Sequence, residues 1–337
     1  MAAVGAALAI ACAGCSGSKD PPRKTVVVYT CLDKIHSEPI LAEFERRTGI
    51  KVLPQYDAES AKTTGLVTRL LARRDRPDCD VLWNNEIIQT ERLAQQGLLA
   101  KYVSPQAERF GAKFRDPEGR WTGFAGRMRV IIYNKDLVGR DDVPTGLADL
   151  AAPKWRGKAA IARPLFGTTL THMIVLHQKW GPEALAEYLR RIRANEVALA
   201  PGNGPVRDLV AAGEWALGLT DTDDAYAAML DGKPVGVAIP DRSQGAVLIP
   251  NTVALVANCP HPTEGKQLID YLLSAEVERR LAKGRSAQIP LATDLQDVKT
   301  PWDELLADTK FMDVDVAQAA GSVTDVLQLL TRAGMAE

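Results

Sequence analysis

The sequence predicts an α/β protein of two lobes joined by two hinge strands, with a ligand cleft between the lobes. Two observations lead to this prediction. Short β-branched runs alternate with helical patterns in both halves of the chain, which is typical of parallel βαβ units. Two long extended runs, 121–133 and 245–256, interrupt that alternation. Each run suits a strand that crosses between lobes, so we expect the chain to return to its first lobe at the second crossing.

The first series of strands and helices fills the N-terminal part of the chain. Thr25–Thr30 is a run of β-branched and aromatic residues, which suits a strand buried on both faces. Ser37 is a suitable N-cap for the following helix, which we expect to end at Gly49. Further strands are expected at 51–54 and 80–83, and further helices at 61–74 and 87–96.

A second series follows the first crossing run. Its strands are expected at 158–163, 197–200, 215–220 and 235–239, and its helices at 168–179, 183–194 and 205–212. After the second crossing run, helices are expected at 263–273, 274–283 and 317–332. This succession predicts a first lobe formed by 25–126 together with 252–337, and a second lobe formed by 127–251.

The N-terminal segment predicts export and a lipid anchor. Residues 1–15 are small and apolar, end at Cys15 and precede a polar spacer at 16–24. The segment is too short to span a bilayer, which takes roughly 20 apolar residues. Small residues before a cysteine are typical of a bacterial lipoprotein signal peptide, so we expect a periplasmic or cell-surface chain anchored to the membrane only through Cys15. The alternative is an alanine-rich, unstructured N-terminus of a cytoplasmic protein.

The composition argues against several classes of function. Lys and Arg total 41 against 42 Asp and Glu, which leaves a net charge of −1 and no basic block for a nucleic acid. The chain has no G-x-S-x-G elbow, no G-x-x-x-x-G-K-[ST] loop and no H-E-x-x-H motif. Beyond the signal, Cys31, Cys79 and Cys259 are too scattered for a disulfide framework. These features favour a binding protein without a catalytic cofactor over an enzyme.

Polar residues gather where the predicted strands end and the helices begin. Ligands of open α/β sheets bind beyond the carboxyl ends of the strands. Each cluster alone also fits ordinary turn and cap chemistry. Taken together, the clusters predict a ligand site that includes Asp33, Asn85, Glu86, Gly167, Thr168, Thr169, Asn203, Thr222 and Asp223.

The carboxylates in this set suit a cation. Asp33, Glu86 and Asp223, together with the neighbouring Asp221 and Asp224, offer hard oxygen ligands of the kind that metal ions bind. The run Asp221–Asp224 resembles the start of a calcium loop, but Ala225-Tyr226 stands where that loop needs its glycine turn. An EF-hand is therefore excluded.

Other residues in the set suit an anion. Thr168 and Thr169 stand at a predicted helix start, where main-chain N–H groups and the helix dipole favour negative charge. Arg127 and Arg129 alternate on the first crossing strand, so both face the same side. One of them is expected to clamp a carboxylate or phosphate, and an ion pair between the lobes is the alternative.

Six segments carry a family resemblance and together span most of the chain after residue 24. They are VVY at 27–29, FERRTGIKV at 44–52, DVLWNNE at 80–86, GRMRVIIYN at 126–134, LADLAAPKWRGK at 147–158 and AQIPL at 287–291. The chain resembles the solute-binding proteins of ABC importers, specifically their ferric-ion-binding, bacterial transferrin-like group. The resemblance implies a type II periplasmic-binding-protein fold that acts as a monomer and delivers its solute to an ABC permease with its ATPase.

The resemblance also implies a ligand set. In ferric binders of this group, a histidine after the first strand, a glutamate after the third and two adjacent tyrosines hold the iron beside a synergistic anion. Here Asp33 falls near the histidine position, Asn85 or Glu86 at the glutamate position, and Thr222-Asp223 in place of the tyrosine pair. The implied iron(III) ligands are Asp33, Glu86 and Asp223, with carbonate, citrate or phosphate as the anion. The implied anion site consists of Arg127, Gly167, Thr168, Thr169 and Asn203.

Three alternatives remain open at this point. Because the tyrosine pair is replaced, the solute is alternatively a phosphorylated or carboxylated organic anion, such as a sugar phosphate or a phosphonate. An exported enzyme on the same scaffold would use Asp33 or Glu86 as a general base, although no nucleophile–base pair is recognisable. A ligand-sensing partner of a membrane receptor would share the same cleft.

Overall fold

A computed structural model describes residues 24–57, 64–241 and 244–336 of the chain. The predicted signal peptide at 1–15, its Cys15 and nearly all of the spacer at 16–24 lie outside the described residues. Within the described ranges, no helix combines the length and apolar character needed to cross a membrane.

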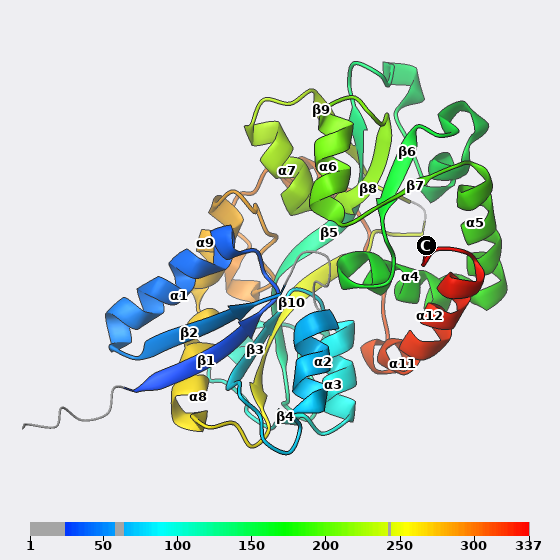
Figure 1. Ribbon diagram of the computed structural model, residues 1–337. Helices are drawn as coiled ribbons and strands as arrows, with labels where there is room; N and C mark the ends of the chain where they lie inside the picture. Colours follow the sequence, from blue (N-terminus) through cyan, green and yellow to red (C-terminus); the bar gives the residue numbers. More distant parts are fainter. Residues whose placement is uncertain (1–23, 58–63, 242–243, 337) are drawn as a thin grey trace, which may run out of the picture.

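The strands form one continuous sheet that runs through both lobes (Figure 1). They are β1 (Thr25–Thr30), β2 (Lys51–Tyr56), β3 (Val81–Asn84), β4 (Leu99–Ala100), β5 (Thr122–Asn134), β6 (Ala159–Ala162), β7 (Ala198–Ala200), β8 (Leu217–Asp221), β9 (Val235–Ala238) and β10 (Leu248–Val256). Their order is β2-β1-β3-β10-β5-β8-β6-β7, with β4 beside β10 and β9 beside β5.

Helices cover both faces of this sheet (Figure 1). They are α1 (Lys34–Thr48), α2 (Thr64–Ala72), α3 (Ile88–Gln95), α4 (Gly167–Trp180), α5 (Pro182–Ala194), α6 (Asn203–Ala211), α7 (Thr222–Leu230), α8 (Pro262–Leu272), α9 (Ala275–Lys283), α10 (Asp303–Ala307), α11 (Val316–Gly321) and α12 (Val323–Arg332). We call the part around β1, β2 and β3 the first lobe and the part around β6, β7 and β8 the second lobe.

Two long antiparallel strands, β5 and β10, connect the lobes. β1 pairs in parallel with β2 and β3, and β6 pairs in parallel with β7 and β8. β10 returns to pair with β3, and its register against β5 shifts between Pro250 and Asn251. The predicted fold class, two αβ lobes joined by two crossing strands, is therefore confirmed.

The first strand is buried on both faces, as its sequence predicts. Val26 and Val28 belong to one hydrophobic core, while Val27 and Tyr29 pack into the other. Alternate residues of a strand point to opposite faces, so both faces of β1 are covered by packed side chains. This burial holds the carboxyl end of β1, and the residues that follow it, in one position.

Two predicted helix boundaries are wrong. The helix expected to begin at Ser37 begins at Lys34, with Asp33 as its N-cap. The Ser37 hydroxyl instead donates to the main-chain oxygens of Leu32 (3.2 Å) and Asp33 (3.1 Å) within the first turn. The single helix expected over 317–332 is divided into α11 and α12 at Ser322, directly after a glycine that weakens helix propagation.

The C-terminal helix also departs from the predicted lobes. The prediction places all of 252–337 in the first lobe, but α12 packs against α4 and α5 of the second lobe. Its apolar stripe, which includes Val326 and Leu330, is fully buried there. An exposed position beside the first lobe would leave that stripe in water, so burial decides the placement. The remaining lobe boundaries stay a prediction.

Candidate functional site

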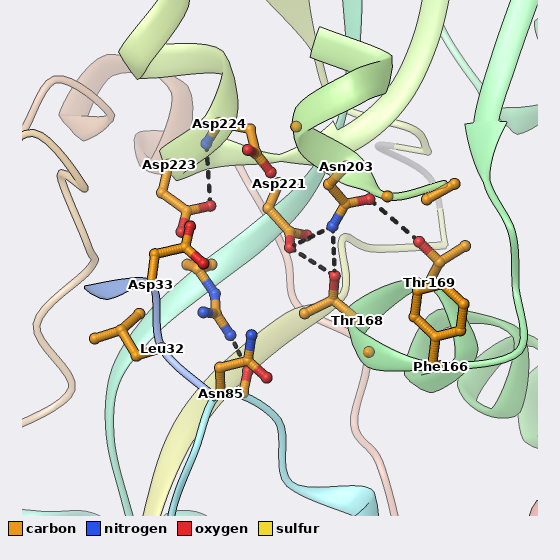
Figure 2. Close-up of a pocket in the computed structure, with 15 residues that line it drawn as sticks. Leu32, Asp33, Asn85, Phe166, Thr168, Thr169, Asn203, Asp221, Asp223 and Asp224 are labelled. Carbon is orange, nitrogen blue, oxygen red and sulfur yellow. Dashed lines mark hydrogen bonds between the residues drawn. The ribbon is translucent and has the colours of Figure 1, made fainter. Parts of the chain in front are cut away.

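A polar pocket lies where the two lobes meet. It is lined by Leu32, Asp33, Asn85, Arg127, Ala162, Phe166, Gly167, Thr168, Thr169, Gly202, Asn203, Gly204, Asp221, Asp223 and Asp224 (Figure 2). β1, β6 and β8 end at this pocket, and α1, α4, α6 and α7 begin at it. It is therefore at the carboxyl edge of the parallel strands, the position at which open α/β sheets bind ligands.

Two helix starts give the pocket hydrogen-bond donors. α4 begins at Gly167, whose φ of 58° is a left-handed conformation that favours glycine. The N-cap of α4, Phe166, and the N-cap of α6, Gly202, both lack a side-chain capping bond. The first N–H groups of a helix have no intrahelical acceptor and carry a partial positive charge. This wall of the pocket suits an anion.

Arg127 on β5 adds a full positive charge. It is only 2% exposed, and one of its terminal nitrogens donates to the main-chain oxygen of Asn85. Its Nε has no hydrogen-bond partner among the described residues. A buried, incompletely bonded guanidinium that lines a pocket is well suited to a carboxylate or a phosphate.

A second arginine lies beneath the pocket and is neutralised there. Arg129 and Asp221 face each other across β5 and β8, and the guanidinium nitrogen lies 2.6 Å from the carboxylate oxygen. Burial alone would raise the pKa of Asp221, but the charges of Arg129 and Arg127 outweigh it and lower that pKa. Arg129 is fully buried, so the pair is part of the pocket floor.

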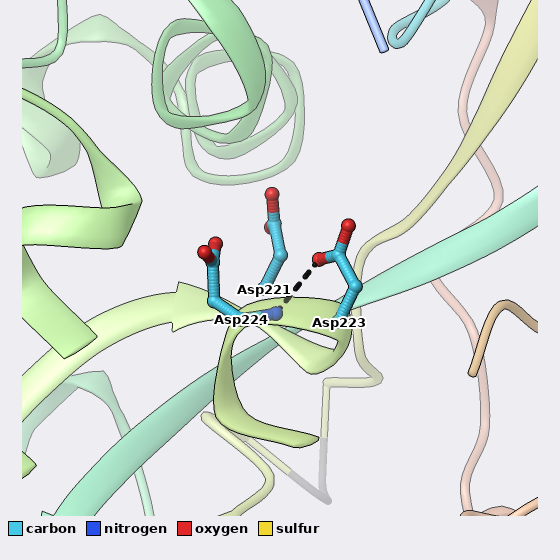
Figure 3. A group of neighbouring side chains, drawn as sticks. All are labelled: Asp221, Asp223 and Asp224. Carbon is cyan, nitrogen blue, oxygen red and sulfur yellow. Dashed lines mark hydrogen bonds between the residues drawn. The ribbon is translucent and has the colours of Figure 1, made fainter. Parts of the chain in front are cut away.

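Acidic side chains make the opposite wall. Asp221, Asp223 and Asp224 fan out from the start of α7, and one carboxylate oxygen from each lies within 4.8 Å of the others (Figure 3). Figure 2 shows Asp33, which precedes α1 in the first lobe, pointing toward Asp223 of the second lobe. Asp224 also accepts a bond from the Thr220 hydroxyl at 3.1 Å. Hard carboxylate oxygens from two lobes suit a cation that arrives when the lobes close.

Most of the predicted site residues meet in this pocket. They are Asp33, Asn85, Arg127, Gly167, Thr168, Thr169, Asn203 and Asp223. Their convergence on one pocket is a geometric finding.

Glu86 does not line the pocket, which corrects its predicted place among the site residues and iron ligands. Its carboxylate is 1% exposed and accepts bonds from the main-chain N–H groups of Ile88 (2.8 Å) and Gln89 (3.0 Å). It also accepts from the side chains of Asn84 (2.9 Å) and Thr171 (2.8 Å). Burial raises the pKa of Glu86, and these donors only partly offset the effect. The residue caps the start of α3 and has no oxygen directed at the pocket.

Thr222 is also absent from the pocket lining. It is fully buried, and its hydroxyl oxygen accepts a bond from the main-chain N–H of Met128 at 3.1 Å. The hydroxyl therefore joins the start of α7 to β5. Tyr226, the nearest tyrosine in sequence, packs edge-on against Trp302 and does not line the pocket either.

The predicted site omitted two acidic lining residues, Asp221 and Asp224. Both belong to the acidic run that begins at the last residue of β8, and the sequence offers them as hard oxygen ligands without placing them in the predicted site. A usable signal was the buried-strand pattern around Arg129, because a buried arginine needs an acidic partner on a neighbouring strand.

Comparison with known proteins agrees with this architecture. The structure superposes on that of iron-bound HitA from Pseudomonas aeruginosa with a TM-score of 0.81 and 22% sequence identity. The superposition covers 92% of this chain and 99% of HitA. Two αβ lobes joined by two crossing strands therefore form the type II fold of periplasmic binding proteins. Residues 89–315 match the family model described as bacterial extracellular solute-binding protein. Since this match spans more than half of the chain, the chain belongs to that family.

Two curated relatives differ in what their names say they bind. Iron uptake protein A1 of Synechocystis sp. is 25% identical over 321 residues, which cover 89% of this chain and 87% of the relative. A Salmonella typhi protein named "Putative 2-aminoethylphosphonate-binding periplasmic protein" is 27% identical over 244 residues, covering 71% of this chain and 69% of that protein. The similarity therefore includes relatives named for a metal and for an organic phosphonate.

Proposed function

We propose that this chain is the solute-binding component of an ABC importer and that it captures ferric ion together with a synergistic anion in the pocket between its lobes. The loaded chain would deliver its solute to a permease driven by an ATPase. In this role the protein acts as a monomer, closes on its ligand and performs no turnover. The observation that supports the proposal best is that one pocket has two chemically different sides. One side, the carboxylate wall, consists of Asp33, Asp223 and Asp224; the other, the N–H wall, consists of the starts of α4 and α6 together with Arg127.

The carboxylate wall is the proposed cation side. Asp33 and Asp223 approach each other from different lobes, whereas the oxygens of the neighbouring Asp224 already accept from Arg207 (3.5 Å) and Thr220 (3.1 Å). When the lobes close, the carboxylate oxygens of Asp33 and Asp223 would surround one ion, and the positive charge of that ion would offset the repulsion between the carboxylates. Asp221 is excluded from this role because Arg129, Thr168 and Asn203 already occupy both of its oxygens.

The N–H wall is the proposed anion side. Carbonate, citrate or phosphate would accept bonds from the starts of α4 and α6 and from Arg127. Bound in this position, the anion would lie beside the cation and complete its coordination. A ferric ion alone would leave these donors without an acceptor.

The proposed compartment is outside the cytoplasm. The description of the family as extracellular and the relative named as a periplasmic protein support this role. We propose that Cys15 carries a lipid and that the spacer at 16–24 tethers the folded chain near its permease. A multiply acylated cysteine would anchor the chain firmly, whereas a single acyl chain binds a membrane only marginally.

Thermal unfolding with Fe(III) and citrate tests the metal assignment. A ligand at 100 times its Kd adds about 2.7 kcal/mol to the free energy of unfolding, and we expect a rise of that order. Asp223→Ala should remove the rise, whereas Asp142→Ala, which changes an exposed carboxylate paired with Lys154, should retain it. Since none of the pocket residues is a tyrosine, the iron complex should lack a phenolate charge-transfer colour. The ferric assignment would be contradicted if Fe(III) failed to stabilise the chain with carbonate, with citrate and with phosphate.

A phosphorylated or carboxylated organic anion is the second candidate. It is favoured by the relative named for 2-aminoethylphosphonate and by the absence of tyrosine among the pocket residues. The anionic group would take the N–H wall, and a cationic group on the same molecule would take the carboxylate wall. Stabilisation by 2-aminoethylphosphonate without iron, lost in Arg127→Ala, would establish this candidate over the first.

A further inference from the structure

Three side chains of the N–H wall are already fully engaged in bonds to one another and to the pocket floor. The Thr168 hydroxyl donates to Asp221 Oδ2 at 2.6 Å, because a carboxylate can only accept. The same hydroxyl oxygen accepts from Arg129 Nη1 (3.1 Å) and Asn203 Nδ2 (2.8 Å). A hydroxyl has one proton and two lone pairs, so Thr168 has no donor left for a ligand.

Thr169 and Asn203 are committed in the same way. The Thr169 hydroxyl donates to Asn203 Oδ1 (3.2 Å) and accepts from Arg129 Nη2 (3.2 Å). The amide of Asn203 donates to both Thr168 and Asp221 (3.0 Å), and its oxygen accepts from Thr169 and from Arg129 (3.3 Å). Every donor on the side chains of these residues therefore points to another protein atom.

Asp221 determines the direction of these bonds. If the Asn203 amide were turned over, its oxygen would face Asp221 Oδ2, and two acceptors would meet at about 3 Å. Arg129 acts on the same three residues from the other side, since it can only donate. An acceptor-only group and a donor-only group thus fix the orientation of the polar atoms between them.

We propose that Asp221 and Arg129 are positioning residues that turn the side-chain donors of Thr168, Thr169 and Asn203 inward, so that an anion in the pocket is bound only by main-chain N–H groups and by Arg127. The inference rests on the proposed function for the identity of this pocket as the solute site. It adds a specificity rule. A subsite of this kind offers donors but few acceptors, so it selects fully ionised oxyanions over groups that carry a hydrogen-bond donor.

A double-mutant cycle in the ligand-free chain tests the commitment of the Thr168 hydroxyl. Thr168→Val and Asp221→Asn should be coupled, with a non-additive effect of about tenfold on the unfolding equilibrium constant in urea. Thr171→Val is the matched control, because Thr171 is a buried threonine of the same helix whose hydroxyl donates to Glu86 at 2.8 Å. Thr171→Val should be additive with Asp221→Asn. Additivity of Thr168→Val with Asp221→Asn would overturn the proposal.

Titration with inorganic phosphate measures a Kd that would not change if Asp221 and Arg129 had only a structural role. Thr168→Val should leave the phosphate Kd within about twofold of the wild type, because no bond to the ligand is lost. Asp221→Asn frees the hydroxyl and removes a negative charge, so it should tighten phosphate binding by about tenfold while it lowers the Tm. The part of that gain that the freed hydroxyl supplies should disappear in the double variant, whereas the part due to the lost charge should remain.

The two sets of measurements separate the inference from the function on which it rests. A tenfold or larger loss of phosphate affinity in Thr168→Val would overturn the inference, since the hydroxyl would then contact the ligand. If the wild type binds none of phosphate, citrate and carbonate, the anion assignment of the proposed function fails. The ligand-free cycle then still decides whether Asp221 holds the hydroxyl inward.

Discussion

The starts of α3 and α4 lie at the same junction of the lobes but are completed in different ways. The first N–H groups of α3 are bonded by the carboxylate of Glu86, which the chain itself supplies. The first residues of α4 line the pocket, and its N-cap Phe166 offers their N–H groups no side-chain bond. Glu86 also bonds Thr171 of α4, so the two helix starts are held to each other.

A helix start that is bonded by a side chain of the protein has a structural role, whereas a helix start left without such a bond at a pocket is a candidate position for a ligand. Both helix starts attract negative charge for the same reason, the unpaired N–H groups and the helix dipole. At α3 the acceptor is a buried carboxyl group of the chain itself, so its bonds contribute to folding. At α4 we propose that the charge arrives with the ligand, so it contributes to binding. Substitutions at the two starts should therefore affect different measurements.

Removing Glu86 should have the largest effect on folding. Glu86→Ala leaves the start of α3 and the side chains of Asn84 and Thr171 without their acceptor. We expect the free energy of unfolding to fall by about 3 kcal/mol in urea denaturation, with a smaller loss for Glu86→Gln, which keeps one acceptor oxygen. At a temperature where the variant is folded, its ligand affinity should stay close to that of the wild type. A variant that folds normally but does not bind would show that Glu86 is a ligand after all.

Removing Arg127 should have the largest effect on binding. Arg127→Ala deletes the one cation that lines the pocket among the described residues, so we expect a loss of about 100-fold in ligand affinity by calorimetry. Arg127→Lys keeps the charge without the planar fork and should lose less. Arg120→Ala is the control, because Arg120 pairs with Asp116 at 2.7 Å away from the pocket. Equal affinity of wild type and Arg127→Ala would place the anion elsewhere.

Gly167 allows a smaller change at the start of α4. An added Cβ would meet nothing within 4 Å, so Gly167→Ala introduces backbone strain at φ 58° without a clash. We expect about 1 kcal/mol of destabilisation together with weaker ligand binding, since relief of the strain would turn the N–H groups. Gly49→Ala is the matched control, because Gly49 also has a positive φ (71°) and no atom within 4 Å of an added Cβ. Gly49 caps the C-terminal end of α1, whereas the pocket lies at the N-terminal end of that helix. The control should lose stability and keep its affinity; equal affinities for both variants would argue against binding at the start of α4.

The smallest expected effect is a difference in pH dependence between Glu86 and Asp221. Burial raises the pKa of Glu86, so the folded state binds more protons than the unfolded state, and its stability falls as pH rises through that pKa. The pKa of Asp221 is lowered despite burial, mainly by the charge of Arg129, so its contribution is lost as pH falls through the lowered pKa. The stability difference between wild type and Glu86→Gln should therefore shrink toward high pH. The difference between wild type and Asp221→Asn should shrink toward low pH, and slopes of the same sign would contradict this account.

The sequence was a good guide to the architecture and to the α4 side of the pocket. The two long extended runs predicted β5 and β10, and the Gly167-Thr168-Thr169 helix start lines the pocket as expected because helix-start chemistry is local. Its binding of an anion stays a prediction. The initial helix cap was misassigned to Ser37, because a serine inside a first turn and a serine at a cap look alike in sequence. Asp33 is the N-cap, although its side chain makes no capping bond.

The roles of the carboxylates were harder to predict because they depend on contacts between distant residues. Glu86 and Asp223 both follow strands, yet Glu86 is only two residues before α3 and folds back onto its N–H groups. Asp221 lies opposite Arg129, which is 92 residues earlier in the chain. No local pattern distinguishes a carboxylate that is neutralised by such a partner from one that lines a pocket.

The most direct test is a crystal structure of the chain grown with Fe(III) and inorganic phosphate. We expect phosphate oxygens about 2.7–3.2 Å from the main-chain nitrogens at the start of α4 and from the Arg127 guanidinium. We expect anomalous density for iron beside Asp33 and Asp223, while Glu86 stays bonded to the start of α3. Phosphate bound away from α4, with no ligand atom at the first main-chain nitrogens of that helix, would contradict the claim that the open helix start is the ligand's position.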